Sequence, residues 1–144
     1  MLRNIKGGKL PKSIEIIFGE KKVEAVLNDT ITSKKLLKLL PIKSNFNLWG
    51  NEIYFKIPLE ADIENGKELM EIGNLAYWPN GNAFCIFFGP TPAGDGSQPR
   101  AISPVTVIGK IINKDDIDKL KEINPSDTIE IRIKTNRQNN KVKK

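Results

Sequence analysis

The chain has 144 residues, a formal net charge of +6 and no histidine. This length is sufficient for a single domain with its own hydrophobic core. The lack of histidine excludes Ser-His and Cys-His nucleophile pairs, a histidine general base and the usual zinc sites. Cys85 is the only cysteine, and its apolar neighbours predict a small buried hydrophobe rather than a catalytic thiol.

Basic side chains are concentrated at the two ends of the chain. Residues 1–12 hold four and residues 134–144 hold five, with no acidic side chain in either, whereas the part between them has 14 basic and 17 acidic side chains. We expect a mobile basic segment at 1–12, a domain at 13–134 and a disordered basic tail at 135–144. The tails would bind nucleic acid only nonspecifically. No apolar leader or membrane-spanning run is visible, so we expect a cytoplasmic protein without a membrane partner.

The first third of the chain predicts a hairpin followed by a helix. Apolar and polar residues alternate over 13–18 and 22–27, with a Gly-Glu-Lys turn between them. Several N-cap candidates at 28–33 precede leucines at helical spacing, and Pro41 ends the pattern. We therefore expect a short helix that packs on the sheet.

The remainder predicts five more strands and a second short helix. The expected strands are residues 52–57, 75–78, 83–88, 105–112 and 128–134. An Asn-Gly turn joins the second and third of these strands. The third is apolar on both faces and is expected to be central in the sheet. Asp115 or Asp116 is expected to cap the helix, which ends before residues 124–127.

About seven short strands, hairpin connections and two short helices describe a mostly β protein. The pattern predicts an antiparallel barrel or a sandwich, with the helices covering its open ends. One domain accounts for the whole pattern.

The long segment 89–103 lies between two predicted strands. Loops of this length are uncommon in compact domains and are often functional. Its three prolines reduce the entropy of the unfolded chain and favour an ordered loop. Arg100 is the only arginine between Arg3 and Arg132, and its guanidinium is suited to a carboxylate, phosphate or carbonyl. The alternative is that Arg100 pairs with a surface acid.

Aromatic residues near strand ends and turns are candidates for the walls of a pocket, namely Phe46, Trp49, Tyr54, Tyr77 and Trp78. Tyr54 shares the polar face of its strand with Glu52 and Lys56, so it either lines a groove or closes the end of a barrel. Asp115, Asp116 and Asp118 would bind a hard cation only weakly, and helix capping explains them better. Neither a metal site nor a cofactor is predicted.

Three blocks resemble the small prokaryotic cyclophilin-like proteins: residues 49–55 (WGNEIYF), 73–81 (GNLAYWPNG) and 84–92 (FCIFFGPTP), followed by Ser103-Pro104-Val105 and Ile108-Gly109. The resemblance extends from about Ser13 to Lys134. It implies a closed antiparallel β-barrel of about eight strands. True cyclophilins are peptidyl-prolyl isomerases, but their Phe-His-Arg motif, Gln-Gly-Gly motif and later histidine are missing here. The resemblance therefore implies no catalytic residue.

These observations predict a module that binds a peptide or a small ligand. The candidate contacts are Glu52, Tyr54, Trp78, Phe88, Thr91 and Arg100. The alternative is a weak or divergent prolyl isomerase, since twisting a prolyl bond over its barrier of ~20 kcal/mol needs no nucleophile or metal. In that alternative Arg100 is the donor to the amide, and Tyr54, Trp78 and Phe88 are the walls. Nucleic-acid binding through the two basic tails is a third hypothesis.

Overall fold

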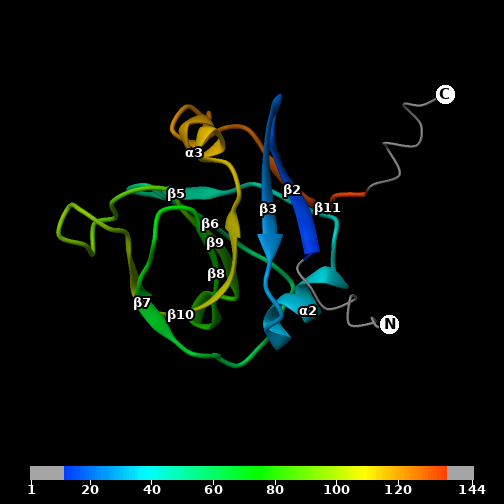
Figure 1. Cartoon of the computed structure of the whole chain (residues 1–144), viewed down its shortest axis with the longest axis horizontal. Coiled ribbons are helices and arrows are strands. Elements are labelled where there is room, and N and C mark those ends of the chain that lie inside the picture. The colour runs from blue at the N-terminus through cyan, green and yellow to red at the C-terminus, as the bar shows by residue number, and fades with distance from the viewer. Residues whose placement is uncertain (1–11, 136–144) are drawn as a thin grey trace.

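The computed structural model describes residues 12–135, so the segments expected at 1–12 and 135–144 lie outside the described residues, apart from Lys12 and Thr135. The described chain forms one curved antiparallel sheet of ten strands. Two short helices, α2 and α3, lie at opposite ends of the curved sheet (Figure 1). This confirms the predicted mostly β class with two short helices.

The strands are β2 (Lys12–Phe18), β3 (Lys21–Leu27), β4 (Ile42–Ser44), β5 (Asn47–Trp49), β6 (Glu52–Lys56), β7 (Lys67–Leu69), β8 (Asn74–Trp78), β9 (Ala83–Phe87), β10 (Arg100–Ile111) and β11 (Ile129–Ile133). The helices are α2 (Ile31–Leu37) and α3 (Lys114–Leu120), with a 3₁₀ turn, η1, at Pro79–Gly81. The strand order is β4-β11-β2-β3-β10-β8-β9-β6-β5, and β7 pairs with β10. Every residue of β9 is buried, which confirms its predicted central position.

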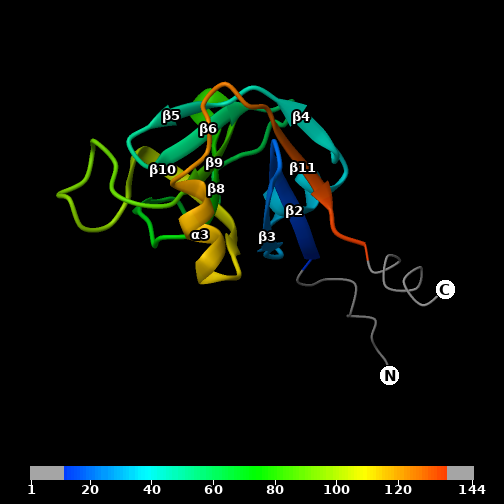
Figure 2. The ribbon, with the colours of Figure 1, turned by 90° about the horizontal axis from the view of Figure 1, so that it is seen from above.

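Closure of the sheet into a barrel is not found. Within residues 12–135, β4 and β5 are the two ends of the strand order and do not pair with each other. They follow one another in the chain, separated only by Asn45 and Phe46, and lie one after the other along the same side of the molecule (Figure 2). Phe46 is buried and packs edge-on against Phe18 at 5.4 Å. The chain itself, rather than a hydrogen-bonded ladder, therefore connects the two edges.

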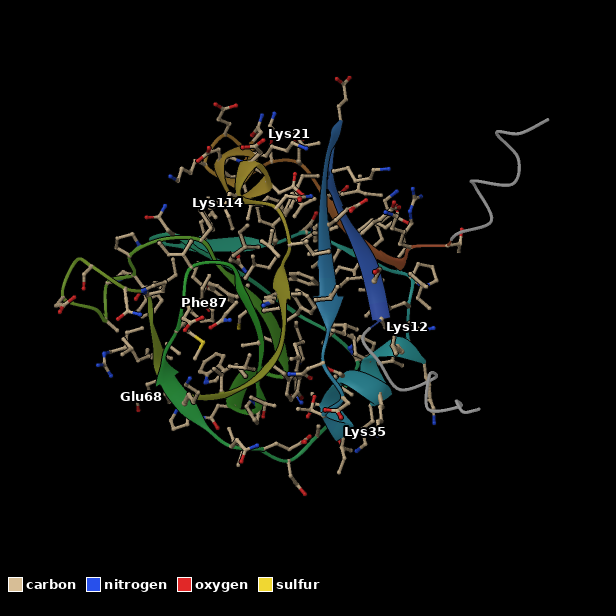
Figure 3. All side chains as sticks on the ribbon, in the orientation of Figure 1. Lys12, Lys21, Lys35, Glu68, Phe87 and Lys114 are labelled. Atoms are coloured by element: carbon tan, nitrogen blue, oxygen red, sulfur yellow. The ribbon has the colours of Figure 1, made fainter. Side chains whose placement is uncertain are left out.

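The sheet buries apolar side chains on both of its faces. The larger cluster includes Phe55 and Phe84, whose rings stack at 5.5 Å. The smaller cluster comprises Met70, Ala76, Ala83, Cys85, Phe87, Ala101 and Val105, with Tyr54, Trp78 and Val107 packed against it. Phe87 lies inside the curved part of the sheet (Figure 3). The smaller cluster forms the base of the candidate site.

The predicted hairpin between β8 and β9 is present, but its turn differs from the expected Asn-Gly turn. Pro79–Gly81 form the turn η1, and the left-handed residue is Asn82, with φ 50° and ψ 43°. The side-chain amide of Asn82 donates to the Leu59 carbonyl at 3.1 Å and to the Tyr77 hydroxyl at 3.0 Å. Asparagine tolerates this backbone region because its amide can bond locally.

The helix boundaries differ from the expected ones at both helices. Thr30 is the N-cap of α2, within the predicted range, but α2 ends at Leu37 rather than at Pro41. The N-cap of α3 is Asn113, which corrects the prediction that Asp115 or Asp116 caps this helix. Both aspartates lie in its first turn, where the helix dipole favours acidic side chains. No helix among residues 12–135 has the length and apolar character to span a bilayer.

Candidate ligand pocket

A partly open cavity of about 120 Å³ lies over the smaller apolar cluster. Its lining comes from four strands and consists of Trp49, Glu52, Tyr54, Trp78, Ala101, Ile102 and Val105. Three of these side chains are large aromatics, three are aliphatic, and Glu52 is the single ionisable carboxylate. The cavity is smaller than the ~300–1,000 Å³ typical of sites for drug-sized ligands. It therefore fits one compact group of a ligand.

Strand register explains why these side chains meet. Trp49 lies directly opposite Glu52 in the β5–β6 pair, and residues two apart on a strand share a face, which adds Tyr54. Across β9, Tyr54 faces Cys85, and Trp78 faces Ala83. Ala83 and Cys85 are small and do not line the cavity themselves, so the larger aromatic side chains of Tyr54 and Trp78 on the neighbouring strands enclose a space.

An irregular stretch at the start of β10 forms the remaining wall. Its pairing with β7 joins Arg100 to Leu69 and then Val105 to Lys67, so extra residues of β10 bulge out of the ladder. Bulges of this kind redirect side chains and occur often beside functional sites. Within the bulge, the Ser103 hydroxyl accepts a hydrogen bond of 2.7 Å from the Trp78 indole N–H. This bond fixes the orientation of the Trp78 ring at the pocket wall.

Glu52 is the electrostatically unusual residue of the pocket. It is only 7% exposed, and within residues 12–135 its carboxylate makes no salt bridge. Burial raises the pKa of Glu52 to about 7, against a smaller opposing effect of a hydrogen bond with the Cys85 thiol. The carboxyl group therefore changes between its neutral and charged forms near neutral pH.

The Cys85 thiol lies below the pocket, on the face of the sheet that also carries Glu52 of the neighbouring strand β6. Its side chain is 1% exposed, which confirms the predicted burial. Burial, and then the charge of Glu52, raise the pKa of Cys85 well above its usual value. Its sulfur also lies 3.9 Å from the Ala83 carbonyl oxygen; with one proton, the thiol donates to only one acceptor at a time. Such a thiol is neutral and unreactive at physiological pH.

The structure brings together three of the six predicted contacts: Glu52, Tyr54 and Trp78. Phe88 is instead buried in the larger cluster, away from the pocket lining. Arg100 pairs with Glu68 at 3.3 Å, with both side chains more than 40% exposed. Figure 3 shows Glu68 on β7 at the periphery of the molecule. The alternative weighed from the sequence, that Arg100 pairs with a surface acid, matches this contact.

Thr91 anchors the long loop that precedes β10. Its hydroxyl donates to the Arg100 carbonyl at 2.6 Å and accepts from the Arg100 amide at 3.1 Å. The loop is also bonded to the β5–β6 turn, where the Asn51 amide donates to the Pro90 carbonyl at 2.9 Å. These contacts agree with the predicted ordered loop and give Thr91 a structural role.

Two further aromatic candidates lie in the core rather than in the pocket. Phe46 belongs to the larger cluster, as does Tyr77, whose hydroxyl donates to the Leu59 carbonyl.

Among the residues described here, no group of three acidic or cysteine side chains is placed to hold a metal ion. Asp116 accepts a hydrogen bond of 3.0 Å from the Glu24 amide and pairs with Lys119 at 2.9 Å, so its role is to connect α3 to β3.

The fold and pocket define a mostly β, antiparallel protein with a small aromatic cavity on one face of its sheet. A family model described as Cyclophilin-like matches residues 12–132, and the chain belongs to this family. The solution structure of the hypothetical protein AF2241 from Archaeoglobus fulgidus is similar, with 35% identity, a TM-score of 0.72, and coverage of 86% of this chain and 95% of that one. No curated protein matches the chain. Family membership alone assigns no activity.

Proposed function

We propose that this protein is a binding module that takes one compact group of a peptide or small ligand into the pocket. The observation that carries the proposal is the enclosure of a cavity by Trp49, Tyr54 and Trp78 above a buried carboxylate. Ligand sites are typically concave, mostly apolar and supplied with few polar groups. A bulged strand and an indole held by a hydrogen bond form walls that exist before a ligand binds.

The pocket contains its own fluorescent reporters. The chain has two tryptophans, and both line the cavity. Titration with p-cresol, 3-methylbutan-1-ol, choline and N-acetylprolinamide is expected to change tryptophan emission for at least one compound. Ala101→Leu fills the cavity and should abolish that change. Ala93→Leu makes the same substitution at an exposed loop position outside the pocket and should leave the change intact.

Two results would contradict the binding proposal. One is that none of the four compounds alters emission at millimolar concentration. The other is that Ala101→Leu, with an unchanged circular dichroism spectrum, responds as the wild type does.

A weak prolyl isomerase is the second candidate function, and the state of Glu52 favours it. A neutral carboxyl group with a pKa of about 7 in an apolar pocket can donate a hydrogen bond to the prolyl nitrogen and so favour the twisted amide. Arg100, the donor expected from the sequence, bonds to Glu68 instead. A protease-free isomerase assay should then show activity that falls above pH 7, is lost in Glu52→Ala and is retained in Arg100→Ala. Activity that depends on Arg100 but not on Glu52 would reject this mechanism.

A further inference from the structure

The charge balance of the pocket is incomplete. Its lining contains one buried carboxylate, Glu52, and no lysine or arginine. A buried charge is costly unless a partner of opposite charge accompanies it. The pocket as it stands therefore suits either a proton on Glu52 or a cation brought by a ligand.

The neighbouring cationic side chains do not fill this role. Lys56 lies on the same face of β6, but it is exposed and lines a different surface cavity, beside Glu60. Arg100 precedes a pocket residue but extends to Glu68 on β7. From β9, Phe87 lies directly opposite Glu52, and the polar group that contacts its carboxylate is the neutral thiol of Cys85. When Glu52 is ionised, a positive charge to pair with it therefore has to come from outside the described residues.

The aromatic walls indicate which cation fits. The faces of tryptophan and tyrosine rings carry negative electrostatic potential and attract a cation within about 6 Å of the ring centre. Two tryptophans and one tyrosine surround this cavity. Three aromatic side chains and a carboxylate line one small cavity, and this combination suits a compact organic cation.

The aliphatic side chains of the cage distinguish between cations. A primary ammonium carries three N–H donors and a guanidinium carries five, whereas the wall from β10 presents the aliphatic side chains of Ala101, Ile102 and Val105. Donors directed at those side chains would lose their hydrogen bonds to water without gaining new ones, which disfavours binding. A methylated ammonium has methyl groups in their place, and these pack against aliphatic side chains without such a loss.

We infer that this pocket binds a methylated ammonium head group, with Glu52 as counter-ion and Trp49, Tyr54 and Trp78 as the aromatic cage. The inference names the ligand class for the binding module proposed above and rests on that proposal. A free small molecule and a methylated lysine side chain are the two sources of such a head group, and both present the same chemistry to the pocket.

The test compares choline with 3,3-dimethylbutan-1-ol, its uncharged carbon isostere, by tryptophan emission at pH 8 and constant ionic strength. Choline should bind at least about tenfold more tightly than the isostere, as expected for a desolvated cation–π site with a counter-ion. Glu52→Gln should remove that difference by weakening choline alone. Glu68→Gln, which removes an exposed carboxylate outside the pocket, should leave it unchanged. Tyr54→Leu should weaken choline at least threefold and affect the isostere less.

The outcomes separate the two proposals. Equal binding of choline and its isostere would overturn the cation inference while supporting a binding pocket. Binding of the isostere alone would do the same. No response to either compound at millimolar concentration would overturn the inference, and a response to p-cresol or N-acetylprolinamide would then still support the binding module. A trimethyl-lysine peptide that binds more tightly than choline would identify a protein as the source of the head group, and weaker binding would identify a small molecule.

Discussion

Glu52 should make the stability of this protein fall as the pH rises through the neutral range. The folded-state pKa is about 7, against 4.5 for an unperturbed glutamate, so the folded state holds a proton that the unfolded state releases. The stabilisation is fully present below pH 4.5 and is lost as the pH rises towards 7. Relative to pH 5, the free energy of unfolding should decrease by about 1 kcal/mol at pH 6, about 2 kcal/mol at pH 7 and about 2.5 kcal/mol at pH 8.

The measurement is guanidinium chloride unfolding at pH 5, 6, 7 and 8, for the wild type and for Glu52→Gln. Few other groups should change their protonation between pH 5 and 8. The chain has no histidine, and burial raises the pKa of Cys85 well above its usual value. The pKa values of three further carboxylates are lowered, namely those of Glu15, Glu64 and Asp116. The variant should show little pH dependence between pH 5 and 8. Parallel curves for the two proteins would refute the reasoning, because the carboxyl of Glu52 would then titrate normally.

Three other substitutions test the packing around the site. Gly109→Ala should lower the free energy of unfolding by about 3 kcal/mol or more, because an added Cβ would lie 2.2 Å from the Val26 carbonyl oxygen. A decrease below about 1 kcal/mol in denaturant unfolding would contradict the close approach of β3 and β10. Thr91→Val should lower the free energy of unfolding by about 1–3 kcal/mol, because it removes both hydrogen bonds to the Arg100 backbone. Thr91→Ser keeps the hydroxyl and should lower it less. Equal stabilities of these two variants would show that the hydroxyl does not stabilise the loop. Arg100→Ala should change the free energy of unfolding by less than about 1 kcal/mol, because Arg100 and its partner Glu68 are both exposed. The ligand-induced change in tryptophan emission should remain. Loss of ligand binding in this variant would show that Arg100 contacts the ligand.

The strands that could be predicted show either a clear alternation of apolar and polar residues or, for β8 and β9, two apolar runs on either side of an Asn-Gly turn. β2, β3, β6 and β11 fall within one residue of the expected ranges at each end, because one side of each strand faces the core. β4, β5 and β7 were missed, since three residues are too few to show a period. β4 and β7 pair with strands that are distant in the sequence, β11 and β10, whereas β5 pairs with the adjacent β6. The gap between β4 and β5, which replaces the expected barrel closure, also depends on the arrangement of distant strands.

The site was predictable only in the part that lies on regular strands. Glu52 and Tyr54 share one face of β6, and alternation is sufficient to place them together. Trp49 was recognised as a wall candidate but not as a contact, because its strand was not predicted. Ala101 and Ile102 carry no signal of their own, since it is the bulge in β10 that turns them towards the cavity. Phe88 is one residue beyond β9 and lies in the larger cluster on the opposite face.

The cost of ionising Glu52 gives the binding proposal a thermodynamic signature. A cation that pairs with the carboxylate lowers the pKa of Glu52. The ligand should therefore stabilise the folded protein mainly above pH 7, where Glu52 is ionised in the folded state and has no other partner of opposite charge. Choline should therefore raise the unfolding temperature more at pH 8 than at pH 5, where the folded protein must first release a proton. The uncharged isostere should give the same shift at both pH values, and so should choline with Glu52→Gln. The titratable group that contacts this carboxylate, the thiol of Cys85, has a pKa raised by burial and stays neutral between pH 5 and 8. A choline effect without pH dependence would therefore mean that the cation does not pair with Glu52.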